Sequence, residues 1–112
     1  MGEDLAADFL ARKGYQILDR NFTSGNVELD IVCRLKEEIV FVEVKTRYNA
    51  IIEPEKAVGT AKQRNMALAA GGYLSRKKIV SNIRFDIIAI NIFGGKVDIA
   101  HFEDAFYPIY YK

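Results

Sequence analysis

Two pairs of charged residues, set in neighbouring apolar segments, are the part of this sequence best suited to chemistry. Glu28 and Asp30 are separated by one residue, and Glu43 and Lys45 repeat that spacing in the next apolar segment. Carboxylate oxygens are ligands that Mg²⁺ prefers, and proteins often hold this ion with one or two carboxylates. A bound divalent cation acidifies a water molecule and stabilises charge on a phosphate under attack. The two pairs therefore suggest metal-assisted hydrolysis of a phosphodiester bond, with Lys45 beside the attacking water.

A β-hairpin is the element that would bring these pairs together. Residues 27–34 (VELDIVCR) and 39–46 (IVFVEVKT) are rich in β-branched residues, which favour strands, and a short polar segment joins them. If residues 36–37 form the turn, antiparallel pairing places Val32 opposite Phe41. This apolar pair would then lie next to the charged residues on the same face of the hairpin.

The same register places Asp30 opposite Glu43 and Glu28 opposite Lys45. Directly opposed side chains lie on one face of a sheet, so three carboxylates and one ammonium group are expected to converge. Opposed like charges destabilise a sheet, and burial further disfavours ionised carboxylates. Lys45 supplies one positive charge, and a divalent cation would supply a second source of compensation. The alternative is an exposed hairpin edge on which Glu and Lys form ordinary ion pairs.

The rest of the chain supplies the elements that must position this hairpin. Hydrophobic periodicity and turn residues predict helices over residues 2–13 and 57–76, and strands over residues 15–22, 83–93 and 97–102. The order αβββαββ predicts a single α/β domain over residues 1–112, a sandwich with a mixed central sheet flanked by helices. Arg84 and Asp86 share a strand face and are expected to form a structural ion pair. The aromatic residues 106–111 are expected to pack on the body of the domain.

Composition restricts the class of protein but not its partner. The 112 residues are 50% hydrophobic, which suffices for a packed core, and 16 basic residues against 15 acidic ones give a net charge of +1. Any nucleic-acid-binding surface must therefore be local. Cys33 is the single cysteine, which excludes a disulfide within the chain and fits a reducing compartment. No signal-peptide pattern or membrane-length apolar run is present, so a cytoplasmic protein without a membrane segment is expected.

Several segments together resemble a known family. They are residues 25–32 (GNVELDIV), 41–47 (FVEVKTR), 2–7 (GEDLAA), 13–15 (KGY), 55–58 (EKAV), 62–64 (KQR) and 84–86 (RFD). In these segments the chain resembles the YraN family, largely uncharacterised bacterial proteins similar to archaeal Holliday junction resolvases. The resemblance covers nearly the whole chain and implies a restriction-endonuclease-like fold of the PD-(D/E)xK superfamily. Fold alone does not establish activity, because function resides in the site.

The resemblance also implies roles for individual residues. Asp30, Glu43 and Lys45 match the catalytic positions of the superfamily, and Asp30 and Glu43 would hold Mg²⁺ or Mn²⁺. Glu3 matches an acid of the first helix that resolvase-like members use. Its place at the margin of the apolar helical face, partly inward, agrees with that role. Glu28 would support these groups from the same strand as Asp30.

Polar residues elsewhere supply candidates for substrate contacts. Gln63 lies on the apolar face of the second predicted helix, where it would either reach the metal site or a phosphate, or be a boundary residue open to solvent. Arg47, Lys62 and Arg64 are candidates for nucleic-acid binding, since Lys and Arg contacts to phosphate supply most non-specific affinity. The alternative for such basic residues is a merely solvated surface.

Three functional hypotheses follow. The first is a Mg²⁺- or Mn²⁺-dependent endonuclease that acts on DNA, including branched or otherwise structured DNA. The second is a nucleic-acid-binding module that keeps the fold without turnover, and the third is a protein-interaction domain whose carboxylates form a structural salt-bridge ladder. The presence of every motif acid and of Lys45 favours the enzyme. DNA is expected as the partner ahead of RNA, although no recognition motif in the sequence separates the two. Resolvase-like enzymes cut two strands as dimers, so the resemblance is compatible with a homodimer.

Overall fold

The computed structural model describes residues 2–51, 53 and 57–107. Their elements are, in chain order, α1 (Gly2–Arg12), β1 (Gln16–Ser24), β2 (Val27–Leu35), β3 (Glu38–Tyr48), α3 (Thr60–Lys77), β4 (Asn82–Phe93) and β5 (Lys96–Phe102). The predicted order αβββαββ is confirmed. The long helix begins at Thr60 instead of near residue 57, after Gly59 in an extended conformation, and β3 continues two residues beyond its predicted end.

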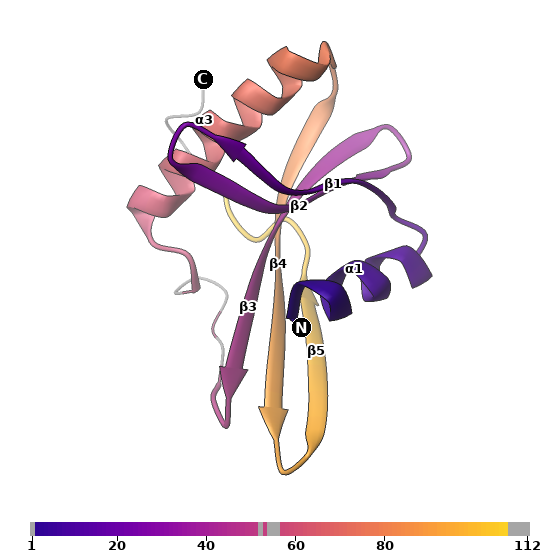
Figure 1. Ribbon diagram of the computed structural model, residues 1–112, viewed down its shortest axis with the longest axis vertical. Helices are drawn as coiled ribbons and strands as arrows, with labels where there is room; N and C mark the ends of the chain where they lie inside the picture. Colours follow the sequence, from indigo (N-terminus) through magenta and orange to yellow (C-terminus); the bar gives the residue numbers. More distant parts are fainter. Residues whose placement is uncertain (1, 52, 54–56, 108–112) are drawn as a thin grey trace.

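The five strands form one mixed sheet in the order β1-β2-β3-β4-β5. Neighbouring strands are antiparallel except β3 and β4, which are parallel because α3 lies between them in the chain and carries it back across the sheet. Figure 1 shows α1 and α3 on opposite sides of this sheet, an arrangement compatible with the predicted sandwich. The hairpin register is the one predicted as far as the strands pair, with Val32 opposite Phe41. The pairing ends at Ile31 and Val42, so the predicted pairs of Asp30 with Glu43 and of Glu28 with Lys45 are absent from it.

Two apolar layers hold the helices against the sheet. On one face, α1 packs through two buried residues, Ala6 and Leu10, against Ile31, Cys33, Val40, Val42, Ile88 and Ile90. On the other face, α3 packs through Met66, Ala67, Ala69, Ala70 and Tyr73 against Val32, Ile39, Phe41, Phe85 and Ile87. The alternating side chains of β3 are thus shared between both layers, as expected for a central strand.

Strand β2 leaves β3 in the middle of the sheet. The paired residues run from Leu35 and Glu38 to Ile31 and Val42, whereas β3 stays paired with β4 as far as Tyr48. Leu29 packs in the α3 layer although Ile31, two residues later, packs in the α1 layer. Residues two apart in a regular strand share a face, so β2 must twist between them. In Figure 1 the β1-β2 hairpin accordingly turns away from β3 and towards α3.

A buried hydrogen-bond network around Asp86 joins β4 to β5 and to the segment after it. The Asp86 side chain has no exposed surface, and Arg84 Nε and Nη2 donate to its two oxygens over 2.8 and 2.7 Å. His101 Nε2 lies 2.7 Å from Asp86 Oδ2, and the Asp104 N–H donates to Oδ1 over 2.9 Å. The predicted Arg84–Asp86 ion pair is therefore confirmed. Burial alone would raise the pKa of Asp86, but the hydrogen bonds from His101, Arg84 and Asp104 outweigh it and hold the pKa below its ordinary value.

The predicted packing of the aromatic tail is confirmed at its first residue. The Phe106 ring stacks on Phe85 with 5.2 Å between ring centroids. Residues 108–111 of the tail, and residues 55–56 of the motif at 55–58, lie outside the described residues. Within the described residues, neither α1 nor α3 is long and apolar enough to cross a membrane.

Candidate metal centre

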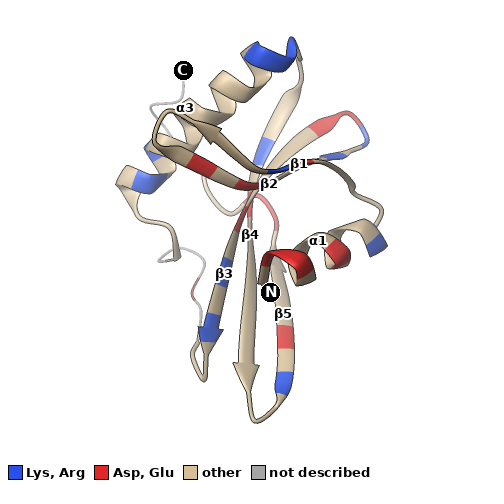
Figure 2. Cartoon of the chain, in the orientation of Figure 1, with Lys and Arg blue, Asp and Glu red and all other residues tan. Residues whose placement is uncertain are grey.

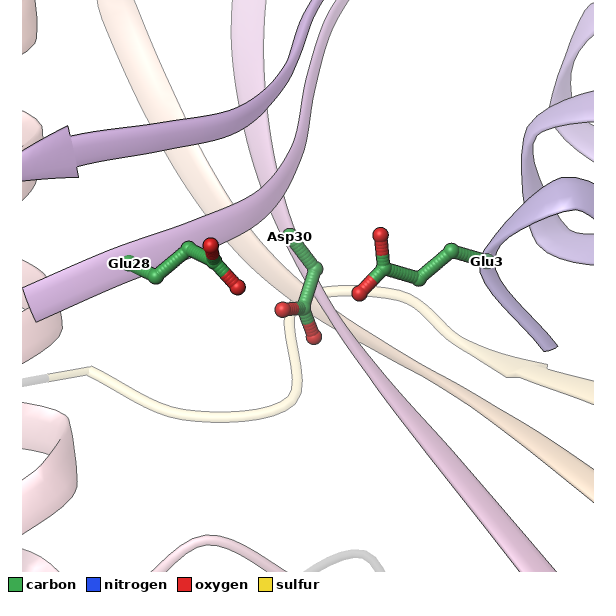
Figure 3. A group of neighbouring side chains, drawn as sticks. All are labelled: Glu3, Glu28 and Asp30. Carbon is green, nitrogen blue, oxygen red and sulfur yellow. The ribbon is translucent and has the colours of Figure 1, made fainter. Parts of the chain in front are cut away.

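Three carboxylates from two elements meet beside the point where β2 leaves β3. Glu3 comes from α1, and Glu28 and Asp30 come from β2. One oxygen of each lies within 4.8 Å of the others, and Figure 3 shows the three groups pointing towards one another. Glu28 is exposed, whereas Glu3 and Asp30 are half-buried. The inward direction predicted for Glu3 is thus confirmed.

The first turn of α1 brings Glu3 to this cluster because Gly2 permits close packing. A Cβ atom at position 2 would overlap Thr46 Oγ1 on β3. Only glycine lacks that atom, so the helix start can rest directly on β3. The start of α1 thus packs closely on β3, on the residue just before Glu3.

Asp30 takes the place of a backbone acceptor in the hairpin. Its Oδ2 accepts a hydrogen bond from the Val44 N–H over 2.9 Å, just beyond the last β2-β3 residue pair. Burial raises the pKa of this carboxyl to about 7; the Val44 N–H opposes the shift, and the negative charges of Glu43 and Glu3 add to it. An aspartate held half-protonated near neutral pH is a costly group, and such groups concentrate at functional sites.

Glu43 is the most buried acid of this region, with 3% of its side chain exposed. Its Oε2 lies 2.5 Å from Lys62 Nζ and 3.4 Å from Lys45 Nζ. Its Oε1 is buried and accepts no hydrogen bond from an N–H or O–H group of the described residues, apart from the one that a protonated Asp30 would donate to Glu43. The expectation that Lys45 balances Glu28 is therefore replaced by a different pairing. Because β2 has left β3 by this point, Lys45 contacts Glu43 on its own strand instead.

The residues present fit a hard divalent cation. Buried polar atoms rarely lack a partner, so the orphan Oε1 of Glu43 needs an explanation. It lies in the immediate surroundings of Asp30, whose pKa its charge raises, and Asp30 in turn belongs to the cluster with Glu3 and Glu28. All of these candidate ligand atoms are carboxylate oxygens, the donor type that suits Mg²⁺ and Mn²⁺. Of the two predicted ligands, Asp30 belongs to this cluster, whereas Glu43 lies beside Asp30 and outside the group of carboxylates that approach one another within 4.8 Å.

Two clefts flank the carboxylates. One of about 450 Å³ is lined by Asn26, Val27, Glu28, Asp30, Ala61, Lys62 and Asn65. The other, of about 420 Å³, is lined by Gly2, Glu3, Asp4, Arg20, Val44 and Thr46. Glu28 and Asp30 thus line the first cleft, and Glu3 lines the second.

The remaining candidates occupy different surroundings. Arg47 is exposed near the end of β3, where its Nη1 donates to the Thr46 carbonyl over 2.9 Å, and Arg64 is exposed on α3. The Gln63 amide is part-buried and donates to the Val58 carbonyl over 2.9 Å, so this contact engages the backbone before α3. Figure 2 shows acidic residues on α1 and β2, with basic residues on the far half of β3 and at both ends of α3.

Sequence reasoning missed one contact of the centre. Lys62 was expected only as a surface contact to nucleic acid, yet its ammonium group is bonded to Glu43. Strand alternation cannot reveal this contact, because Lys62 belongs to a helix that follows β3 through a separate connection. The only signal available is its position in the first turn of the helix that crosses the sheet face. Lys62 therefore enters the site through tertiary structure alone.

The raised pKa of Asp30 makes a prediction about stability. Asp30→Asn is expected to stabilise the metal-free protein by about 1 kcal/mol near pH 8. The protonated carboxyl contributes stability that is fully present below its ordinary pKa of 3.8 and is lost as the pH rises through about 7. The variant should thus gain little near pH 5 and most above pH 7. Urea unfolding in a chelator at both pH values measures this, and an equal gain at both would refute the assignment.

Comparison with known proteins places the chain among its relatives. The model of the uncharacterised protein family UPF0102 matches residues 2–90, a range that contains Glu3, Glu28, Asp30, Glu43 and Lys62. A UPF0102 protein of Syntrophotalea carbinolica is 46% identical and covers 94% of this chain and 87% of the relative. For UPF0102 proteins of Geobacter sulfurreducens and Bacteroides thetaiotaomicron the identities are 47% and 42%, over 94% and 96% of this chain and 84% and 89% of theirs. The chain therefore belongs to the uncharacterised protein family UPF0102, which confirms the resemblance to the YraN family.

Proposed function

We propose that this protein is a Mg²⁺- or Mn²⁺-dependent endonuclease that hydrolyses phosphodiester bonds of DNA. The observation that carries the proposal is the orphan Oε1 of Glu43, which is buried close to Asp30 and its two acidic neighbours. A protonated Asp30 offers Glu43 a hydrogen bond, which is one cause of the raised pKa of Asp30, but this donor is lost as the pH rises through about 7. Above that pH a purely structural salt-bridge ladder gives no reason to bury a carboxylate oxygen without a donor. A divalent cation between Glu43 and Asp30 would satisfy that oxygen and offset the charge of the cluster.

In this mechanism the chain's own residues orient the reactants. Asp30 and Glu43 would hold the cation, which supplies an acidified water and stabilises charge on the attacked phosphate. Glu3 and Glu28 face Asp30 and would fix the waters that complete the cation's shell. Lys45, with 18% of its side chain exposed, lies 3.4 Å from Glu43 Oε2 and would donate hydrogen bonds to the attacking water or to the phosphate oxygens.

The substrate and setting follow from the surroundings of the site and from the resemblance. The two clefts beside the acids suit a strand that crosses the carboxylates, and Arg47 and Arg64 would contact its phosphates. The similarity to resolvases favours branched or otherwise structured DNA over RNA. It also favours a homodimer that presents two sites. A single cysteine, Cys33, buried as a free thiol, suits action in the reducing cytoplasm.

One observation favours a second candidate, a nucleic-acid-binding module without turnover. Lys62 and Lys45 both approach Glu43 Oε2, so the protein partly neutralises this acid without a metal ion. In such a module the lysines would serve as permanent counter-ions. Nucleic-acid binding would then be independent of divalent cations. This difference separates the two candidates by experiment.

The test is cleavage of labelled linear, flapped and four-way-junction DNA with Mg²⁺ or Mn²⁺. Wild type is compared with Asp30→Asn and Lys45→Ala, each checked for folding by circular dichroism. Cutting that disappears in both variants supports the endonuclease, and the relative rates rank its substrates. Binding without cutting, unchanged by a chelator, supports the module instead. Cutting that persists in Asp30→Asn would exclude the proposed centre.

A further inference from the structure

Lys62 occupies an unfavourable place for a positive charge. It is the third residue of α3, whose first turn contains no acidic residue and whose N-cap, Gly59, makes no side-chain hydrogen bond. A helix N-terminus carries a partial positive charge and disfavours cations nearby. Within the described residues, the structure records one ion-pair partner for the Lys62 ammonium group, Glu43, on the neighbouring strand. Its position therefore depends on the negative charge of Glu43.

The two lysines that contact Glu43 differ in how easily their ammonium groups could move away from its carboxylate. Lys45 lies on β3 itself and has 18% of its side chain exposed, whereas Lys62 has 45% exposed and lines the cleft beside Glu28 and Asp30. A divalent cation that satisfies Glu43 would bring two positive charges into a region already holding two ammonium groups. Repulsion between them is relieved most easily by moving the more exposed group. That group is Lys62, and the cleft gives it space.

We propose that Lys62 is an internal counter-ion that holds Glu43 in the metal-free protein and moves to a phosphate of the substrate once a divalent cation binds. This exchange rests on the proposed function and adds regulation to the same site. Before the cation arrives, the ammonium group lowers the cost of burying Glu43. Afterwards it lies in the cleft at the helix N-terminus, where its charge and the helix dipole both attract a phosphate.

The first test measures cation binding without nucleic acid. Lys62→Met keeps much of the side-chain length and removes the charge, and Lys96→Met makes the same change at an exposed residue of β5. Calorimetric titration with Mn²⁺ near pH 8 is expected to show binding about three- to tenfold tighter in Lys62→Met, and unchanged binding in Lys96→Met. Mn²⁺ should also raise the melting temperature more in Lys62→Met than in wild type.

The second test measures DNA binding with and without a cation. Fluorescence anisotropy of a labelled duplex is recorded in chelator and in Ca²⁺, which takes oxygen ligands as Mg²⁺ does, and gels check that the duplex stays intact. In chelator, Lys62→Met should bind as wild type does. In Ca²⁺ it should bind about three- to tenfold more weakly, with a salt dependence reduced by about one unit of slope.

The outcomes separate this exchange from the proposed function. Wild type that binds no divalent cation would overturn both. Cation binding by wild type, with equal or weaker affinity in Lys62→Met, would overturn the exchange alone. An equal loss of DNA affinity in chelator and in Ca²⁺ would show that Lys62 contacts phosphate permanently, and this also rejects the exchange. Tighter cation binding together with a cation-dependent loss of DNA affinity is the result expected.

Discussion

Replacing Glu43 by glutamine is expected to lower the rate of metal-dependent DNA cleavage by about a thousandfold or more. The amide has the same shape, so the apolar layers around this buried residue should stay intact. It removes the negative charge that would hold the cation, and it leaves Lys45 and Lys62 without their shared partner. Single-turnover cleavage at saturating protein measures the chemical step directly, and circular dichroism checks the fold.

A matched control makes this result specific to the site. Glu37 lies in the exposed turn between β2 and β3. Glu37→Gln therefore removes one carboxylate charge, as Glu43→Gln does, but at a position outside the candidate site. This control should cleave at the wild-type rate. Raising the concentration of Mn²⁺ should recover part of the activity of Glu43→Gln, because a weakened site still fills at high cation concentration. Equal rates for wild type and Glu43→Gln would remove Glu43 from the mechanism.

Replacing Asp86 by asparagine is expected to lower the free energy of unfolding by about 3–5 kcal/mol. Asp86 is fully buried and accepts hydrogen bonds from Arg84 and the Asp104 N–H, with His101 Nε2 also in contact. The neutral amide would leave the guanidinium of Arg84, of which 12% is exposed, without its main counter-charge. A loss of this size is a large part of the stability of a small domain. Urea unfolding measures it, with Asp98→Asn on exposed β5 as the control.

The lowered pKa of Asp86 gives this prediction a pH dependence. A carboxyl whose pKa is depressed by folding contributes stability above its ordinary pKa of 3.8 and loses it as the pH falls through the folded value. The difference between wild type and Asp86→Asn should therefore be constant near neutral pH and shrink below about pH 4. A difference that grows on acidification would contradict the buried ion pair as its source.

Most of the fold could be predicted from the sequence, because the residue patterns that specify its strands and helices are local. Alternation in β2 and β3, together with a short polar turn, was enough to predict the register that places Val32 opposite Phe41. The apolar character of residues 83–93 predicted a strand, and residues 85–90 of β4 are buried. The start of α3 was harder to predict, because Gly59 and the residues before it carry no clear capping signal. The structure shows an N-cap there without a side-chain hydrogen bond.

The arrangement of the candidate site could be predicted only in part from the sequence. The sequence placed Asp30 and Glu43 in facing strands, and the inward position of Glu3 followed from helical periodicity. It did not reveal that β2 leaves β3 at Asp30, because the departure depends on how the β1-β2 hairpin packs against α3. That departure moves Glu28 towards Glu3 and leaves Lys45 with Glu43. Contacts between residues distant in the chain, such as Lys62 with Glu43, need the tertiary structure.

The central claim is that Asp30 and Glu43 bind a divalent cation, and its most direct test is calorimetric titration of the purified protein with Mn²⁺ near pH 8. Wild type is predicted to bind with an affinity in the micromolar to millimolar range. Asp30→Asn and Glu43→Gln should each bind at least about tenfold more weakly, a cost of about 1.4 kcal/mol, while Glu37→Gln binds normally. Absence of binding by wild type, or equal binding by all four proteins, would contradict the metal centre.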